Sequence, residues 1–200
     1  MVLLFGGYLH AEEKKWFVEL GWSSLPSSIT GKHESKDASG LKGIENDWEA
    51  LNKFYGEAGY RFELENDSNV YTSIGVDFLM TKVPVTHATF FTKVSLLYPV
   101  FINGYAMQIG PKMKFVIPFS SSYEDSDDGK FTRKVEYDTS AAFAFGMEAL
   151  WGEEDVQFVT GIEYLASSNY KGEVKDDTGY ANSTINLNGV YVNLGIRFRF

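Results

Sequence analysis

The chain ends in the stretch Val190-Tyr-Val-Asn-Leu-Gly-Ile-Arg-Phe-Arg-Phe200, in which apolar residues alternate with other residues. Strict alternation is the signature of an extended strand with one apolar face. One face would carry Val190, Val192, Leu194, Ile196, Phe198 and Phe200. The other would carry Tyr191, Asn193, Gly195, Arg197 and Arg199. The end of the chain is therefore predicted to be a two-faced β-strand.

The same alternation recurs upstream and predicts seven more strands, at about residues 16–23, 57–64, 70–80, 90–98, 105–115, 140–151 and 157–164. Residues 47–55 could form an amphipathic turn that uses Trp48, Leu51 and Tyr55, or an extension of the second strand. We prefer the extension, because Trp48, Ala50 and Phe54 keep the parity of the strand's apolar face. Pro111 falls on the apolar face of the fifth strand. Since proline removes a ladder donor, we expect a β-bulge there.

The predicted connections alternate in length. Short turns fall at about residues 65–69, 99–104 and 152–155, whereas long polar loops cover 24–54, 120–139 and 166–184; the short 81–86 connection is an exception on the long side. Short turns on one rim and long loops on the other are typical of membrane barrels. We predict an all-β fold, an eight-stranded antiparallel up-and-down transmembrane β-barrel with short periplasmic turns and long extracellular loops.

Periodicity alone does not say which face is inside, since a soluble lipocalin-type barrel would bury the apolar face. The polar faces carry a column of glycines: Gly21, Gly59, Gly75, Gly110, Gly146, Gly161 and Gly195. Glycine weakens a solvated strand, but inside a narrow barrel it makes room for long neighbouring side chains. The polar face is therefore predicted to be the interior, with a lumen filled by side chains.

The polar faces also carry a balanced set of charges. We predict a lumenal ion-pair network of Glu19, Glu57, Arg61, Glu63, Asp77, Lys93, Lys112, Lys114, Glu148, Glu163, Arg197 and Arg199. Matched charges favour structural pairing over general acid and base roles. The apolar faces have aromatic residues near their ends, which is typical of membrane interfaces. The expected interfacial aromatics are Trp16, Trp22, Tyr98, Tyr105 and Trp151.

The terminal aromatic, preceded by alternating apolar residues, resembles the assembly signal of small outer-membrane barrels. Over residues 15–200 the chain resembles the OmpA/OmpX-type outer-membrane β-barrel family. The resemblance implies a monomer in the bacterial outer membrane, in contact with outer-membrane lipids and lipopolysaccharide. It also implies insertion by the outer-membrane assembly machinery, which would read Leu194, Ile196, Phe198 and Phe200. Unlike OmpA itself, the barrel is followed by nothing that implies a peptidoglycan-binding domain.

Residues 1–11 have a short apolar run ending at small Ala11, but no basic segment before it. They are interpreted as a truncated signal-peptide remnant, which leaves residues 12–200 as the barrel domain. The net charge of −9 argues against nucleic acid as a partner. Cysteine is absent, so disulfides and thiolate chemistry are excluded.

The histidines are His10, His33 and His87, and His87 is expected at the mouth of the barrel, where the fourth strand begins. No spacing of serine, histidine and aspartate resembles a catalytic motif. We therefore predict no catalytic residue and no cofactor. The acidic run at 124–130 does not fit the register of a calcium loop, so no metal site is predicted. Weak divalent bridging of this run to lipopolysaccharide stays open.

The leading functional hypothesis is a structural or surface-interaction protein whose long loops bind an extracellular ligand of unknown identity. Two alternatives from other classes stay open: a narrow porin-like channel, and a lipid-A-modifying outer-membrane enzyme.

Overall fold

The computed structural model describes residues 14–24, 29–37, 40–48, 52–64, 67–80, 85–102, 104–127, 131–138, 140–166, 170–174 and 180–200. The signal-peptide prediction for residues 1–11 lies outside them. Among the described residues, no helix is long and apolar enough to cross a membrane. The strands are β1 (Trp16–Ser24), β2 (Ile29–Asp37), β3 (Gly40–Trp48), β4 (Asn52–Glu63), β5 (Asn69–Met80), β6 (Val85–Ile102), β7 (Tyr105–Asp127), β8 (Phe131–Tyr137), β9 (Ala142–Gly152), β10 (Val156–Ala166), β11 (Tyr170–Val174), β12 (Tyr180–Asn186) and β13 (Gly189–Arg199).

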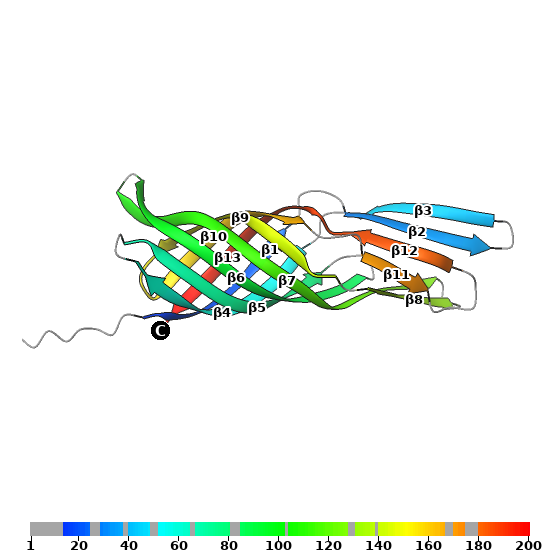
Figure 1. The fold of residues 1–200 in the computed structure, drawn as a ribbon, viewed down its shortest axis with the longest axis horizontal. Coiled ribbons are helices and arrows are strands. Elements are labelled where there is room, and N and C mark those ends of the chain that lie inside the picture. The colour runs from blue at the N-terminus through cyan, green and yellow to red at the C-terminus, as the bar shows by residue number, and fades with distance from the viewer. Residues whose placement is uncertain are drawn as a thin grey trace, which may run out of the picture.

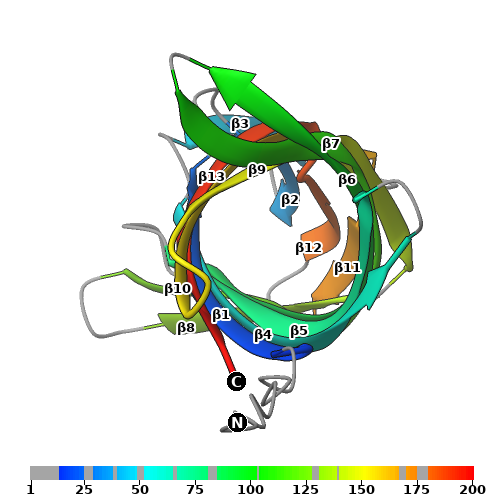
Figure 2. The same ribbon diagram turned by 90° about the vertical axis from the view of Figure 1, so that its left-hand side faces the viewer.

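Eight strands form a closed antiparallel barrel, in the order β1, β4, β5, β6, β7, β9, β10 and β13 (Figure 2). The first and last strands meet in a continuous ladder that includes Glu19 opposite Arg197 and Gly21 opposite Gly195. On the other side, β7 pairs with β9 over ten residue pairs, from Met107 opposite Trp151 to Val116 opposite Ala142. The predicted eight-stranded up-and-down barrel is confirmed.

The three long connections contain five further strands, which the sequence did not predict. They form a sheet in the order β3-β2-β12-β11-β8, joined to the barrel where β8 pairs with the end of β7. Figure 1 shows this sheet continuing beyond one end of the barrel, which we call the long-loop end. The predicted extension of the second barrel strand over 47–55 is confirmed for residues 52–55, which belong to β4, and is wrong for residues 47–48. Trp48 belongs to β3, because residues 40–48 find a local hairpin partner in β2.

The opposite, short-turn end also differs from the prediction in one place. Residues 99–102 were expected in a turn but belong to β6, which pairs with β7 as far as Ile102 opposite Tyr105. The two intervening residues are Asn103 and Gly104, a sequence that favours two-residue hairpin turns. Gly104 has a positive φ of 84°, a backbone conformation that glycine adopts readily.

The expected bulge at Pro111 is also wrong. The register is the same on both sides of it, since Ser95 pairs with Lys112 and Tyr98 pairs with Ile109. The irregularity in this ladder lies instead where Ala88 pairs with Ser120 and Thr89 with Pro118, which leaves Phe119 as the additional residue. Bulges tolerate proline because they interrupt the ladder hydrogen bonds, and here Pro118 is the proline beside the bulge.

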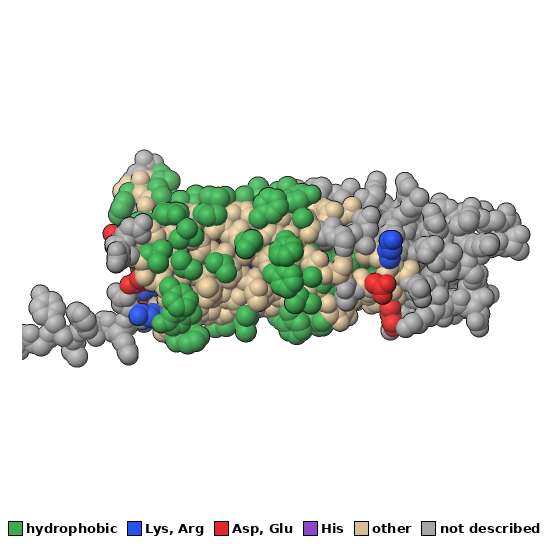
Figure 3. Space-filling view, in the orientation of Figure 1, with side chains coloured by type: hydrophobic (Ala, Val, Ile, Leu, Met, Phe, Trp, Pro, Cys, Tyr) green, Lys and Arg blue, Asp and Glu red, His purple; other side chains and the backbone are tan. Residues whose placement is uncertain are grey.

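The outer surface of the barrel is apolar and the interior carries the charges. Ile74, near the middle of β5, is 69% exposed, whereas Arg197 of β13 is 0% exposed. Figure 3 shows hydrophobic side chains spread over the barrel wall, with charges near its ends. The five expected interfacial aromatics, Trp16, Trp22, Tyr98, Tyr105 and Trp151, are all exposed on this surface. This arrangement is the inverse of a soluble barrel.

Interior glycines make room for aromatic rings. The ring of Tyr55 lies where a β-carbon on Gly21 would be, and its hydroxyl lies close to the corresponding position at Gly195. Phe17 occupies the equivalent space beside Gly59. The glycine column thus lets large inward side chains cross the narrow lumen, as aromatic residues do beside glycines in other sheets.

Candidate functional site

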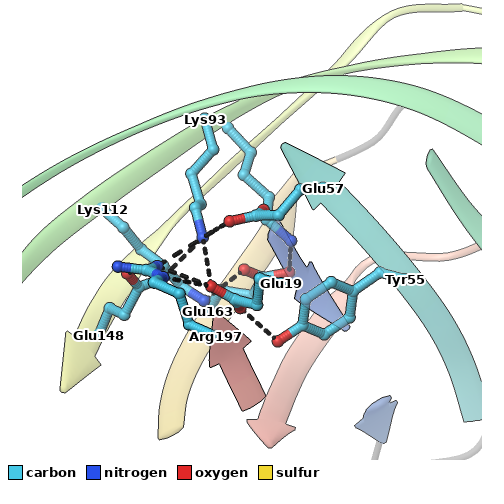
Figure 4. A network of polar contacts seen from close by, with 9 residues as sticks. Glu19, Tyr55, Glu57, Lys93, Lys112, Glu148, Glu163 and Arg197 are labelled. Carbon is cyan, nitrogen blue, oxygen red and sulfur yellow. Dashed lines mark hydrogen bonds and ion pairs between the residues drawn. The ribbon is translucent and has the colours of Figure 1, made fainter. Parts of the chain in front are cut away.

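The centre of the barrel holds a cluster of three carboxylates and two cations, shown in Figure 4. Arg197 donates from Nε and Nη2 to Glu19 Oε2, at 2.9 and 2.7 Å. Its Nη2 also donates to Glu148 Oε1 at 3.0 Å. One guanidinium therefore joins the first and last barrel strands to β9 through charge-assisted hydrogen bonds.

Lys93 is the second cation of this cluster. Its Nζ lies 3.0 Å from Glu148 Oε2 and 3.7 Å from Glu19 Oε2, and it forms an ion pair with Glu57. The five residues come from β1, β4, β6, β9 and β13. Lys93 connects β6 to three strands that do not neighbour it in the wall, and Arg197 connects β13 to β9 across β10, so the cluster braces the barrel across its interior.

A second cluster lies beside the first and joins β7 to β10. Lys112 Nζ is 2.8 Å from Glu163 Oε2, and Lys114 Nζ is 3.3 Å from Glu163 Oε1. The first cluster has one excess negative charge and the second has one excess positive charge. Together the two are neutral, which favours burial of charged side chains.

Arg197 and Lys114 also contact aromatic rings. The guanidinium of Arg197 lies 4.3 Å from the centre of the Phe17 ring and 4.6 Å from that of Tyr71. Lys114 Nζ lies 4.6 Å from the centre of the Phe91 ring. Such cation–π contacts are stronger when water is excluded. The hydroxyl of Tyr55 donates to Glu19 Oε1 at 2.8 Å and so joins the aromatic and charged parts of the interior.

Two apolar layers enclose the charged clusters along the barrel axis. The layer toward the short-turn end consists of Phe17, Tyr71, Leu97, Leu150 and Val159. The layer toward the long-loop end consists of Tyr55, Leu79, Phe91, Val116, Tyr137, Ala142, Ala144, Leu165, Tyr170, Leu187 and Tyr191. The two charged clusters therefore lie between two groups of buried side chains, where electrostatic interactions are stronger than in water.

Four of the twelve charged residues predicted for the lumen lie outside these clusters. Arg61 forms an ion pair with Glu63 at 2.6 Å near the short-turn end, where the side chain of Glu63 is partly exposed. Arg199 donates to the backbone oxygen of Lys14 at 2.6 and 3.2 Å. Asp77 lies toward the long-loop end and accepts a hydrogen bond from Thr89 Oγ1 at 2.7 Å.

The sequence reasoning missed Lys53, which is buried in the lumen with its Nζ 4.5 Å from the centre of the Tyr191 ring. The signal was present, because Lys53 has the same strand parity as Glu57 and precedes it by four residues. Tyr55, which links the aromatic layer to Glu19, lies between them on the same face and was also missed.

His87 was expected at the mouth of the barrel and is instead buried inside it. Its Nδ1 lies 3.2 Å from Ser121 Oγ, and its ring packs against Tyr170. A serine nucleophile needs access to its substrate, whereas Ser121 is buried here. We therefore interpret this pair as packing within the lumen. Within the described part of the chain, no three His, Asp or Glu side chains are arranged so that they could hold a metal ion. The side chains of residues 124–130 lie outside that part.

The four residues of the expected assembly signal point outward from β13 and are exposed: Leu194, Ile196, Phe198 and Phe200. The backbone of Phe200 completes the ladder between the two ends of the chain. Its N–H donates to the oxygen of Trp16 at 3.0 Å and its oxygen accepts from the N–H of Trp16 at 3.2 Å. The terminal residue thus closes the barrel at the short-turn rim.

An apolar outer surface around a closed, ion-paired interior defines the class to which this fold belongs: the small eight-stranded barrels of outer membranes. The chain is similar to the outer membrane protein OprG from Pseudomonas aeruginosa, with a TM-score of 0.57, 10% identity, and coverage of 94% of this chain and 96% of that chain. It is also similar to the Neisserial surface protein A, with a TM-score of 0.48, 13% identity, and coverage of 92% and 97%. Of these two, the OprG match supports a shared fold. No protein-family profile and no curated protein sequence matches the chain.

Proposed function

We propose that the protein is an integral outer-membrane barrel that presents the sheet at its long-loop end as a surface for binding an extracellular ligand. The membrane location is supported by the apolar outer surface, where Leu20, Ile74 and Phe158 are all exposed. Exposing so many large apolar side chains to water would be costly, whereas a bilayer solvates them. Short turns would then face the periplasm and the long connections the outside of the cell.

One observation supports the binding of an extracellular ligand: the sheet at the long-loop end has an unpaired edge. Within the described strands, β3 pairs with β2 alone and so ends the sheet. An edge strand presents unpaired N–H and C=O groups along one side, and these can pair with an extended segment of another chain. The ladder of β2 and β3 runs over nine residue pairs, from Ile29 opposite Trp48 to Asp37 opposite Gly40. It therefore offers a long edge for strand addition.

The interior supports a binding role over transport. The lumen is crossed by the ion-paired clusters and by apolar layers that include Leu97, Leu150 and Tyr170, each nearly fully buried. An eight-stranded barrel has just enough interior space for its own side chains. Opening a continuous aqueous path would require these groups to leave their partners.

The test replaces residues 30–47 with a short Gly-Ser linker and measures retention of expressing cells on surfaces coated with extracellular-matrix proteins. We expect retention to be lost while the barrel keeps its heat-dependent shift in gel mobility, because β2 and β3 lie outside the barrel ladder. The matched control makes the same kind of replacement, with a Gly-Ser linker, at residues 81–84. These residues connect β5 to β6 at the same end. Equal retention of wild-type protein and both variants would refute the interaction role.

A further inference from the structure

The hairpin formed by the end of β6 and the start of β7 leaves the barrel wall at the short-turn end. Its ladder runs from Tyr98 opposite Ile109 to Ile102 opposite Tyr105. On one side, β5 ends its pairing with β6 where Asn69 pairs with Leu97. On the other side, β7 stays paired with β9 as far as Met107 opposite Trp151, so only the tip beyond Met107 lacks a neighbouring strand on both sides. Figure 2 shows the hairpin projecting outward from the circular wall, and Figure 1 shows it rising from the same end as the short turns.

The ladder between β6 and β7 is interrupted below the hairpin, at a point where β7 is still paired with β9. Pairs are formed by Ser95 with Lys112 and by Tyr98 with Ile109, but not by the residues between them. Pro111 has no N–H to donate. At Gly110, a β-carbon would overlap the backbone oxygen of Leu96, so the close approach of the two strands requires glycine.

The tip of this hairpin is apolar on both of its faces. Phe101 is 76% exposed and Tyr105 is 78% exposed. The two residues lie on opposite faces of the hairpin, since Tyr105 pairs with Ile102, the residue next to Phe101. Ile102 and Tyr98 are also exposed. Residues 98–106 contain no charged side chain, whereas the two other connections at this end carry acidic residues at 65, 67 and 153–155. A contiguous apolar patch of this kind marks a surface that contacts a membrane or another molecule.

We propose that the tip of the β6–β7 hairpin, residues 98–102 with 104 and 105, inserts into the interfacial layer of the phospholipid leaflet around the short-turn end. This inference rests on the proposed membrane location. The tip is continuous with the apolar outer surface of the barrel, it points away from the barrel axis, and its aromatic residues are of the kind that favour membrane interfaces. The inserted hairpin would act as a lateral anchor that resists displacement of the barrel along the membrane normal.

The absence of cysteine from the chain allows the test to use single cysteines at Phe101 and Tyr105. Each variant, F101C or Y105C, is spin-labelled and refolded into phosphatidylcholine nanodiscs. Collision of the label with lipid-soluble oxygen is then compared with collision with a water-soluble nickel complex. I74C serves as the reference for a membrane-facing wall position, and E153C as the reference for an exposed turn at the same end.

We expect labels at both tip positions to collide with oxygen several-fold more, relative to nickel, than the label at position 153. A tip label at either position that is as accessible to nickel as the label at 153 would overturn the anchor, provided that the label at 74 is protected. A label at 74 that is itself open to nickel would instead contradict the membrane location. Each variant is first checked for the heat-dependent gel shift, so that misfolding is not read as exposure to water.

Discussion

Replacing Arg197 with methionine is expected to lower the free energy of unfolding by about 3–5 kcal/mol, the cost of removing one partner from a buried ion pair. Arg197 is fully buried and donates to both Glu19 and Glu148. Without its guanidinium, three buried carboxylates would share Lys93 as the remaining cation of the cluster. Methionine fills similar space but supplies no positive charge.

The loss is measured by urea titration of the barrel refolded into lipid vesicles. Lys14→Met is the matched control, because it removes a cation from an exposed pair with Asp155. Exposed pairs contribute about 0–1 kcal/mol, so this control should stay close to wild type. The double variant R197M/E19Q should lose less than the sum of its single changes, because it also removes one of the unpaired carboxylates. A loss below about 1 kcal/mol for Arg197→Met would contradict the bracing role of the cluster.

Ile74→Lys is expected to destabilise the barrel in a bilayer by about 2–4 kcal/mol, the range for lysine on the membrane face near the midplane. Ile74 is an exposed residue near the middle of β5, on the outer surface. The charge would have to lie in hydrocarbon or draw the side chain toward an interface. The same titration measures the effect, with Ile74→Leu as the control for a change of shape alone. An unfolding free energy for Ile74→Lys equal to that of wild type would mean that this face meets water.

Strand parity was enough to predict the barrel, because the outer and inner surfaces differ so strongly in polarity. Each step of one residue moves a side chain from one surface to the other. Alternation in the last strand therefore placed Ile196 outside and Arg197 inside, and the glycine at 195 marked the inner face. The glycines predicted which face is the interior. Gly21, for example, leaves space that the ring of Tyr55 fills, and a strand face in water would not need that space.

The long-loop sheet was missed because both of its faces lack the apolar alternation that marks a barrel strand. Residues 29–37 read Ile-Thr-Gly-Lys-His-Glu-Ser-Lys-Asp, with little apolar content on either parity. The sequence also could not predict which charged side chains of the lumen contact one another. Parity predicts that Lys93, Glu57 and Glu148 face inward, but the stagger of the tilted strands decides which of them meet. Lys93 thus contacts carboxylates from β1, β4 and β9, none of which neighbours β6 in the wall.

The central claim is that this barrel turns its apolar face outward and its charges inward, and refolding tests it most directly. The urea-unfolded chain is diluted either into detergent micelles or into buffer alone, and each sample is run on a gel with and without boiling. We predict that the unheated sample migrates as a compact, faster band, and shows β-rich circular dichroism, when detergent is present and not when it is absent. A compact, soluble β-rich protein formed in buffer alone would contradict the claim.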